Sequence, residues 1–339
     1  MKKLLSIILV LIMVLSLAAC SQAEQPAEAP AADAPAAEAP QAGEQLIIGF
    51  NANSLANENM SFMAEYFRAY GEENNIKILT SECQGDTATM LSNLENFVAA
   101  GAQGIILHNY DPTGVESMLL DLQEKGIVVV SYDEPSELCA HSYYVSNEDL
   151  GKQIAQNVIN WYNENLEGPV KIALFTLENY EFMKVRGDAC KAALEAGIPG
   201  CTVITQDGRT TDKVDLFNNM LAADPDIQIL VGLYDSGVVG VAEAWYGDLV
   251  GAGKDISQYG VFASDATDIA LNLINKAKNG EGIMRGTIDL GLKDNVPDSI
   301  IKSIHAAILG EDWGYPQMNP FPYRFVTVEN IDEFAQYLD

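Results

Sequence analysis

The chain has 339 residues, of which 48 are Asp or Glu and 19 are Lys or Arg, giving a formal net charge of −29 at pH 7. A surface this acidic repels phosphate backbones, so nucleic acid is excluded as an expected partner. The length exceeds what a single hydrophobic core usually serves, and two lobes are expected.

The N-terminus has the pattern of a secretory signal peptide. Met1-Lys2-Lys3 is followed by an apolar run over residues 4–15, and the run closes on Leu17-Ala18-Ala19-Cys20. It is short for a spanning helix, which needs about 20 apolar residues. Leu-Ala-Ala-Cys resembles the lipobox of bacterial lipoproteins, which implies cleavage after residue 19 and a lipid on Cys20. We therefore expect a signal peptide over 1–19 and a lipid anchor at Cys20.

Residues 20–45 read as a spacer. Beyond Cys20 the segment is nearly all Ala, Pro, Glu and Gln, with prolines at positions 26, 30, 35 and 40. It has too little apolar surface to offset the entropy of ordering, and each proline interrupts any helix. A disordered linker of this kind lets a globular body stand away from a membrane.

From residue 46 onward, short β-rich apolar runs alternate with amphipathic helical stretches. The predicted strands are Leu46–Phe50, Ile76–Thr80, Gly104–Leu107, Ile127–Ser131, Val170–Phe175, Thr202–Thr205, Ile229–Gly232 and Gly260–Ala263. The predicted helices of the first half are Met60–Asn74, Thr87–Ala100 and Thr113–Lys125. This alternation predicts an α/β fold with parallel strands and helices on both faces. Because the rhythm restarts near residue 170, we expect two doubly wound lobes.

Polar side chains follow the predicted strands, at the edge where open parallel sheets bind ligands. They are Asn53, Ser54, Asp86, Asn109, Asp133, Glu134, Glu178, Asp207, Arg209, Tyr234, Asp235 and Asp265. Carboxylates, amides and a guanidinium together suit a ligand dense in hydroxyls. For any single residue, capping of the next helix is an equal alternative.

Further candidates lie beside this set. Arg186 falls in the helix after the Val170–Phe175 strand, and the alternative for it is a surface salt bridge. Aromatic residues that either stack on a sugar ring or pack in the core are Phe62, Tyr110, Tyr132, Tyr180 and Tyr234.

Several segments together resemble the periplasmic ribose- and galactose-binding proteins, the type I family that shares its core with the lactose repressor. They are Ile47–Ser54, Gly104–Asn109, Val128–Asp133, Val145–Asn147 with Gly151, Arg186-Gly187, Asp224–Asp235 and Gly260–Asp265. The resemblance implies that Asn109, Asp133, Arg186 and Asp265 hydrogen-bond a sugar, with Ser54 nearby.

The resemblance also implies three crossings between lobes, near Ser146-Asn147, Leu290-Gly291 and Phe321-Pro322. The expected lobes are therefore 46–146 plus 291–321, and 147–290 plus 322–339.

The chain departs from the ribose-binding pattern at several positions. Glu134 stands where the family has an Arg, Tyr234 replaces an Asn, and the usual Gln near Leu290 is absent, while Met60 and Ser61 replace stacking aromatics. The predicted ligand-binding residues are thus Ser54, Asn109, Asp133, Glu134, Arg186, Tyr234 and Asp265. Ribose itself is disfavoured, because a buried polar group left without a partner costs about 1 to 3 kcal/mol.

No catalytic or metal-binding pattern is found. The three histidines are scattered, no C-x-x-C pair occurs, and Gly251-Ala252-Gly253-Lys254 lacks the Ser or Thr of a phosphate-binding loop. Carboxylates of the cleft are compatible with a glycosidase pair, which is the weaker interpretation. Cys190 and Cys201 form either a disulfide or two free thiols. We expect no cofactor and no metal.

The sequence therefore predicts an extracytoplasmic, lipid-anchored solute-binding protein that captures a sugar-like ligand by lobe closure. Its expected partners are the permease and ATPase of an ABC importer, and it is expected to be a monomer. The alternative is a sensory subunit that presents ligand to a chemoreceptor or a sensor kinase. A repressor is disfavoured, because the signal peptide and lipobox occupy the place of a DNA-binding helix-turn-helix.

Overall fold

A computed structural model describes residues 45–209, 212–312, 314 and 316–338. The predicted signal peptide, Cys20 and all but the last residue of the spacer lie outside this part of the chain. Within it, no helix is both long enough and apolar enough to cross a membrane.

The first sheet contains six parallel strands in the order β11-β5-β4-β3-β1-β2. Its strands are β1 (Leu46–Ala52), β2 (Ile76–Glu82), β3 (Gly104–Asn109), β4 (Val128–Asp133), β5 (His141–Tyr144) and β11 (Met318–Pro320). The helices that belong with it are α2 (Glu58–Glu73), α3 (Thr87–Ala99), α4 (Pro112–Glu124) and α10 (Asn295–Ile308).

The second sheet repeats this topology, in the order β12-β10-β9-β8-β6-β7, and only β12 is antiparallel to its neighbour. Its strands are β6 (Lys171–Thr176), β7 (Thr202–Asp207), β8 (Ile227–Gly232), β9 (Gly260–Phe262), β10 (Met284–Asp289) and β12 (Arg324–Thr327). Its α-helices are α5 (Asn147–Asn165), α6 (Glu181–Gly197), α7 (Lys213–Ala223), α8 (Val239–Gly251) and α9 (Asp268–Lys278). Short 3-10 turns are η1 (Asp235–Gly237), η2 (Ile256–Gln258) and η3 (Ile331–Tyr337).

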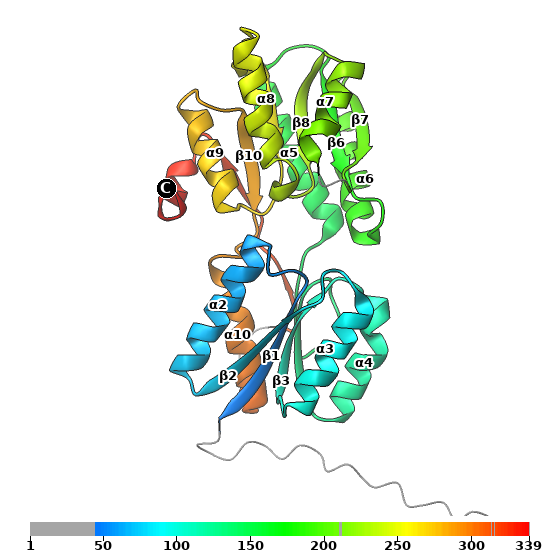
Figure 1. The fold of residues 1–339 in the computed structure, drawn as a ribbon, viewed down its shortest axis with the longest axis vertical. Coiled ribbons are helices and arrows are strands. Elements are labelled where there is room, and N and C mark those ends of the chain that lie inside the picture. The colour runs from blue at the N-terminus through cyan, green and yellow to red at the C-terminus, as the bar shows by residue number, and fades with distance from the viewer. Residues whose placement is uncertain (1–44, 210–211, 313, 315, 339) are drawn as a thin grey trace, which may run out of the picture. The chain divides into compact units, whose positions relative to one another are not determined.

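Helices cover both faces of each sheet (Figure 1). In the first lobe α2 and α10 pack together on one face and α3 and α4 on the other, and in the second lobe α5 packs on α6 while α7, α8 and α9 form a row. The prediction of two doubly wound α/β lobes is confirmed. The predicted strands are all present, and β3 and β4 continue two residues further than predicted, as far as Asn109 and Asp133.

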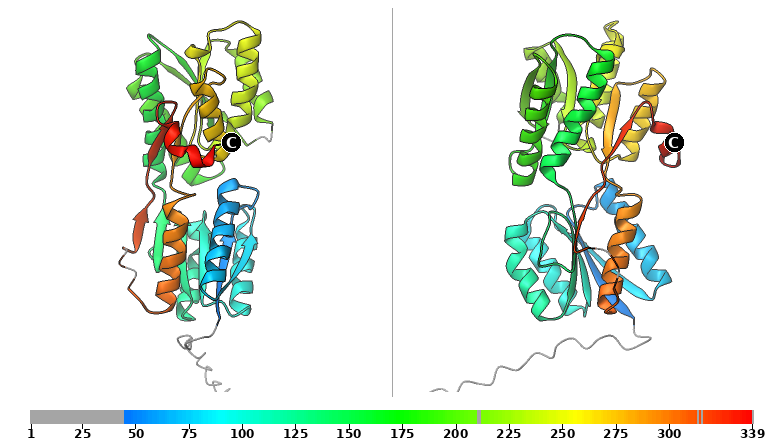
Figure 2. Two further views of the ribbon diagram at one scale, coloured as in Figure 1. Left: turned by 90° about the vertical axis from the view of Figure 1, so that its left-hand side faces the viewer. Right: turned by 180° about the vertical axis from the view of Figure 1, so that it is seen from behind.

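Three segments join the lobes, and Figure 2 shows them side by side between the two sheets. The chain leaves the first sheet between β5 and α5, returns between β10 and α10, and leaves again between β11 and β12. One hydrophobic core runs from the first lobe through these segments into the second, including Val145, Leu290, Leu292 and Phe321. The segments are thus anchored by apolar burial in both lobes.

Local chemistry sets the helix starts near the sheet edges. Asp86 accepts a hydrogen bond from the Thr89 amide at 2.7 Å and caps α3, and Ser146 caps α5 through the Asp149 amide. Asp86, proposed from sequence for the cleft, is therefore an exposed capping residue. The four cysteines of the described chain are free, so the alternative of two free thiols holds for Cys190 and Cys201.

Candidate functional site

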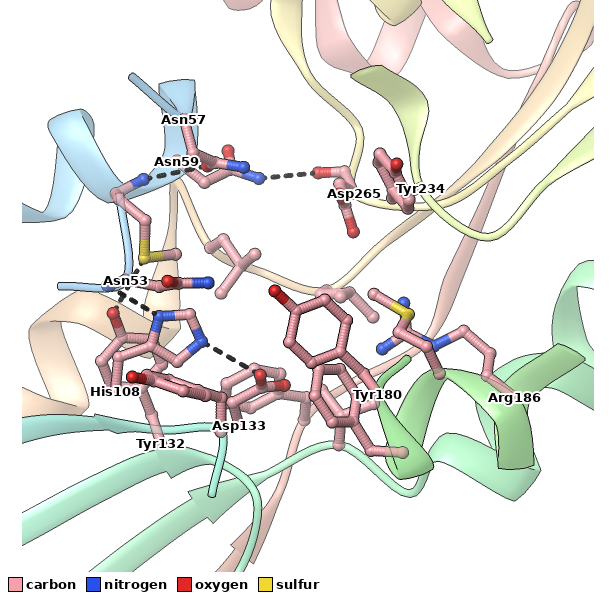
Figure 3. Close-up of a pocket in the computed structure, with 18 of the residues that line it drawn as sticks. Asn53, Asn57, Asn59, His108, Tyr132, Asp133, Tyr180, Arg186, Tyr234 and Asp265 are labelled. Atoms are coloured by element: carbon pink, nitrogen blue, oxygen red, sulfur yellow. Dashed lines mark hydrogen bonds and ion pairs between the residues drawn. The ribbon is translucent and has the colours of Figure 1, made fainter. Parts of the chain in front are cut away.

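A cavity of about 260 Å³ lies where the carboxyl ends of the two sheets face each other. Its polar lining is Asn53, Asn57, Asn59, His108, Asp133, Arg186, Ser236 and Asp265, together with Tyr110, Tyr132, Tyr180 and Tyr234. Figure 3 labels most of these residues and shows that they come from both lobes, with the Tyr180 hydroxyl reaching into the middle of the space. We call this space the inner cavity.

His108 and Asp133 form the first-lobe side of the inner cavity. The His108 Nε2 lies 3.0 Å from the Asp133 Oδ2, and the His108 Nδ1 accepts from the Asn53 amide at 3.3 Å. Since Nδ1 is an acceptor, neutral His108 carries its proton on Nε2, and this N–H donates a hydrogen bond to Asp133. The His108 ring stacks on Tyr132, with ring centroids 4.6 Å apart. One carboxylate oxygen of Asp133 is thus fixed by the protein and the other is left for a ligand.

Arg186 forms the second-lobe side. It is 4% exposed, its Nε donates to the Asn147 Oδ1 at 2.8 Å and its Nη1 donates to the Leu233 carbonyl at 3.0 Å. Burial lowers the pKa of Arg186, and the charges of Asp133 and Asp265 oppose that shift. The guanidinium keeps further N–H groups for a ligand, because these two bonds use only part of its five donors.

Asp265 completes the charged set. Burial raises the pKa of Asp265 to about 7, while Arg186 pulls the value down. Both Asp265, at φ 114°, and Asp133, at φ 86°, have left-handed backbone conformations that are costly for residues other than glycine. Strain of this kind persists where the surrounding structure holds it, commonly at ligand sites. The two carboxylates occupy similar places: Asp133 is the last residue of β4 and Asp265 lies three residues after β9, and both strands are inner strands of their sheets.

Asn59, at the start of α2, provides a free acceptor. Its side chain is 1% exposed and its Nδ2 donates to the Asp265 carbonyl of the other lobe at 3.5 Å, while its Oδ1 has no partner among the described residues. An unpaired buried amide oxygen is costly. A donor on a bound ligand would relieve that cost.

A second cavity, of about 700 Å³, borders the first and shares Tyr110, Val145, Tyr180 and Phe182 with it. Glu134 lines this outer cavity, and its carboxylate accepts from the Asn147 Nδ2 at 2.6 Å. Burial raises the pKa of Glu134 to about 7, with a further rise from Asp133. Glu134, Asn147 and Arg186 thus form a hydrogen-bonded chain that links the outer cavity to the inner one.

The structure brings four of the predicted site residues together around the inner cavity: Asp133, Arg186, Tyr234 and Asp265. Ser54 and Asn109 lie outside its lining, and Glu134 faces the outer cavity. Asn109 is fully buried and donates to the Glu134 carbonyl at 3.1 Å. Direct contact of these three residues with a ligand stays a prediction.

Several other candidates from the sequence bond to or pack against neighbouring protein groups. Asp235 is buried and accepts from Thr267 and Thr287, and Asp207 pairs with exposed Arg209. Phe62 packs beside Tyr66 and is not part of either cavity. The other four aromatic candidates line the inner cavity.

Sequence reasoning missed His108, Asn57 and Asn59. His108 ends the apolar run of β3, one residue before Asn109, so its place at a strand end was the available signal. Asn57 is the cap of α2 and accepts from the Met60 amide at 3.2 Å, so local capping conceals its position at the cavity. No cluster of His, Cys, Asp and Glu suited to a metal is present in the described ranges.

The sequence of residues 48–293 matches the family model described as the periplasmic binding protein domain. The chain belongs to this family. Its members are solute-binding proteins rather than enzymes, so the expectation of a non-catalytic protein is confirmed. The resemblance to the type I sugar-binding family is confirmed as well.

Two curated relatives support the assignment. The chain is 22% identical to the ABC transporter periplasmic-binding protein YphF of Escherichia coli (strain K12) over 226 residues. This alignment covers 64% of this chain and 66% of YphF, which is just under two thirds of that protein. A 275-residue alignment, 76% of this chain, is 22% identical to a putative rhizopine-binding protein of Rhizobium meliloti and spans 82% of it.

Solved structures of binding proteins share the fold. A Bacillus halodurans C-125 ABC transporter solute-binding protein with bound myo-inositol aligns with a TM-score of 0.71 at 20% identity, covering 86% of this chain and 98% of that one. A Thermotoga lettingae solute-binding protein in complex with 5-methylthioribose aligns with a TM-score of 0.72 at 15% identity, covering 85% and 88%. At these identities the likeness establishes the two-lobe fold of this periplasmic binding protein.

Proposed function

We propose that this protein captures a sugar or similar cyclic polyol between its lobes and delivers it to the permease and ATPase of an ABC importer. The observation that carries the proposal is the convergence of Asp133, Arg186 and Asp265 from opposite lobes on one cavity. Carboxylates accept from neighbouring hydroxyls and a guanidinium donates to them, so this set matches a ring edge dense in hydroxyls. The sugar- and polyol-bound relatives support the same ligand class.

Capture proceeds by closure in this proposal. Ligand first binds the first-lobe groups, including Asp133, whose carboxylate is oriented by His108. The second lobe then brings Arg186 and Asp265 over the ligand. Closing the lobes excludes water and strengthens each charged hydrogen bond. Micromolar affinity needs about 8 kcal/mol in total, which a few such bonds and the burial of ring carbons supply. Asn109 supports the backbone at Glu134, and the Glu134 carboxylate orients Asn147, which accepts from Arg186.

The membrane attachment belongs to the same proposal. A lipid on Cys20 and a spacer to residue 45 would hold the body, as a monomer, at the outer face of the cytoplasmic membrane beside its permease. Mass spectrometry of the protein purified from membranes tests this: the expected N-terminal peptide begins at an acylated Cys20. An unmodified N-terminus removes the anchor and leaves the binding proposal intact.

The test of capture is a thermal-shift screen of pentoses, hexoses, inositols and nucleosides, followed by small-angle X-ray scattering with each ligand that binds. A binding ligand is expected to reduce the radius of gyration. Asp133→Asn is expected to weaken binding about 10- to 150-fold, because it removes a charged acceptor worth about 1.5 to 3 kcal/mol. A ligand that binds without any compaction contradicts the closure.

A further inference from the structure

The inner cavity has a wall without polar side chains, made by the three segments that join the lobes. It consists of Val145, Leu290, Leu292 and Phe321, which we call the crossing floor. These side chains are 3% to 7% exposed and belong to one continuous hydrophobic core. Their positions are therefore fixed by packing in both lobes.

The charged side chains of the cavity all lie elsewhere. Asp133 ends strand β4, Asp265 follows strand β9, and Arg186 comes from helix α6. Leu177 and Met183 of the second lobe extend the apolar lining beyond the crossing floor. The charged side chains of the lining thus come from the strand ends and α6, whereas the crossing segments contribute apolar side chains alone to the described lining.

This division has an energetic consequence for a ring-shaped ligand. A hydroxyl over Asp133 or Arg186 exchanges water for a charged partner, and such hydrogen bonds are the strong ones. A hydroxyl over the crossing floor gives up water and finds no polar side chain among these four residues, so part of its desolvation cost is not recovered. A methyl or methylene group at the same place gains from leaving water.

We infer that the ligand is a cyclic polyol with an apolar edge, in which a deoxy, methoxy or alkylthio group replaces a free hydroxyl on the side that faces the crossing floor. This inference rests on the proposed function, because it assumes that Asp133, Arg186 and Asp265 bind the hydroxylated side. It narrows the ligand class from sugars in general to partly apolar ones.

Isothermal titration of the full-length chain against matched pairs tests the inference. Suitable pairs are galactose and its 6-deoxy form, ribose and 5-methylthioribose, and myo-inositol and its monomethyl ethers. For at least one ring, the substituted member is expected to bind about ten-fold more tightly, equivalent to about 1.4 kcal/mol.

Two variants of the crossing floor test whether this wall causes the preference for the substituted ring. Leu290→Gln places an amide beside the ligand and is expected to reduce the ratio of dissociation constants within a pair to near one. Leu290→Met keeps an apolar side chain of similar volume and is expected to preserve the ratio. Both ligands of a pair are measured on the same variant, so a general loss of stability affects the two dissociation constants equally and cancels in their ratio. If Leu290→Gln fails to fold, the ratio measured on the wild-type protein tests the inference by itself.

The outcomes separate the two proposals. If every unsubstituted ring binds as tightly as its substituted partners and still compacts the protein, the inference is overturned and the proposed function stands. A ratio unchanged in Leu290→Gln overturns the role of the crossing floor. If no ring of either kind binds, the proposed function fails and the inference with it.

Discussion

His108 is the side chain that orders the first-lobe half of the cavity. It accepts from the Asn53 amide, contacts Asp133 and stacks on Tyr132. We expect His108→Phe to keep the stacking and lose both hydrogen bonds, weakening ligand affinity about ten-fold, since each unpaired group costs about 1 kcal/mol or more. Titration calorimetry measures this change.

His305 offers a matched control for that variant. It also contacts a tyrosine, with its Nδ1 3.0 Å from the Tyr70 hydroxyl, but it lies on α10 outside both cavities. His305→Phe should leave affinity unchanged. Equal losses in the two variants would show that general destabilisation, rather than the order of Asp133, accounts for the effect.

Asp265 makes stability depend on pH. Burial raises its pKa from 3.8 to about 7, so the folded, ligand-free protein binds this proton more tightly than the unfolded chain does. Between these values the native state holds more protons, and the free energy of unfolding therefore falls as pH rises from about 4 to 7. Glu134 acts in the same direction, from 4.5 to about 7.

We expect the ligand-free protein to be more stable at pH 5 than at pH 8, and Asp265→Asn to reduce the difference. Urea unfolding at the two pH values measures it. The variant comparison is essential, because lowering the pH also reduces the net negative charge of the whole chain. An identical pH dependence in Asp265→Asn would contradict the contribution of this carboxyl group.

At the scale of elements, helices α2 and α9 of opposite lobes meet at their N-termini. Glu58 accepts from the Asp268 amide at 2.9 Å, and Lys293, between β10 and α10, contacts the carboxylates of both residues. The Lys293 side chain is 9% exposed, whereas those of Glu58 and Asp268 are 33% and 49% exposed, and this partly shielded cluster bridges the two lobes. It therefore favours the arrangement in which the lobes are together.

Glu58→Gln keeps an acceptor for the amide and removes one charge partner of Lys293. We expect the arrangement to lose about 1 to 2 kcal/mol, which weakens ligand binding roughly five- to thirty-fold. Glu72→Gln on the same helix is the control, because Glu72 forms an exposed ion pair with Arg68 on α2 and should have no effect. Titration of both variants with one ligand decides, and equal affinities would contradict the role of the cluster.

Elements were more predictable from sequence than their side-chain partners. The strands were found because buried parallel strands are continuous apolar runs, and Asp133 and Asp265 because they follow such runs. Glu134 follows a strand too, but its carboxylate turns to Asn147, which lies 13 positions later at the start of α5. Asn59 approaches Asp265 across 206 positions, and no local pattern records such a contact.

At the scale of the whole molecule, charge opposes compactness. Acidic residues outnumber basic ones by 48 to 19, so most carboxylates have no cation to pair with. Exposed pairs within helices, such as Arg68 with Glu72 and Lys152 with Glu148, offset little, since each contributes about 0.3 to 0.5 kcal/mol. Repulsion summed over the surface therefore exceeds the local attractions.

Salt screens both the repulsion between carboxylates and the attraction within ion pairs. The larger of the two decides whether added salt raises or lowers the stability of the protein. Raising sodium chloride from 0.01 to 1 M shortens the Debye length from about 30 to 3 Å, which removes the repulsion between distant carboxylates. We expect the Tm of the ligand-free protein to rise by about 1 to 2 °C, as for a gain of about 1 kcal/mol in a protein of this size. Differential scanning calorimetry measures it, and a fall in Tm would mean that local ion pairs stabilise the lobes more than net charge destabilises them.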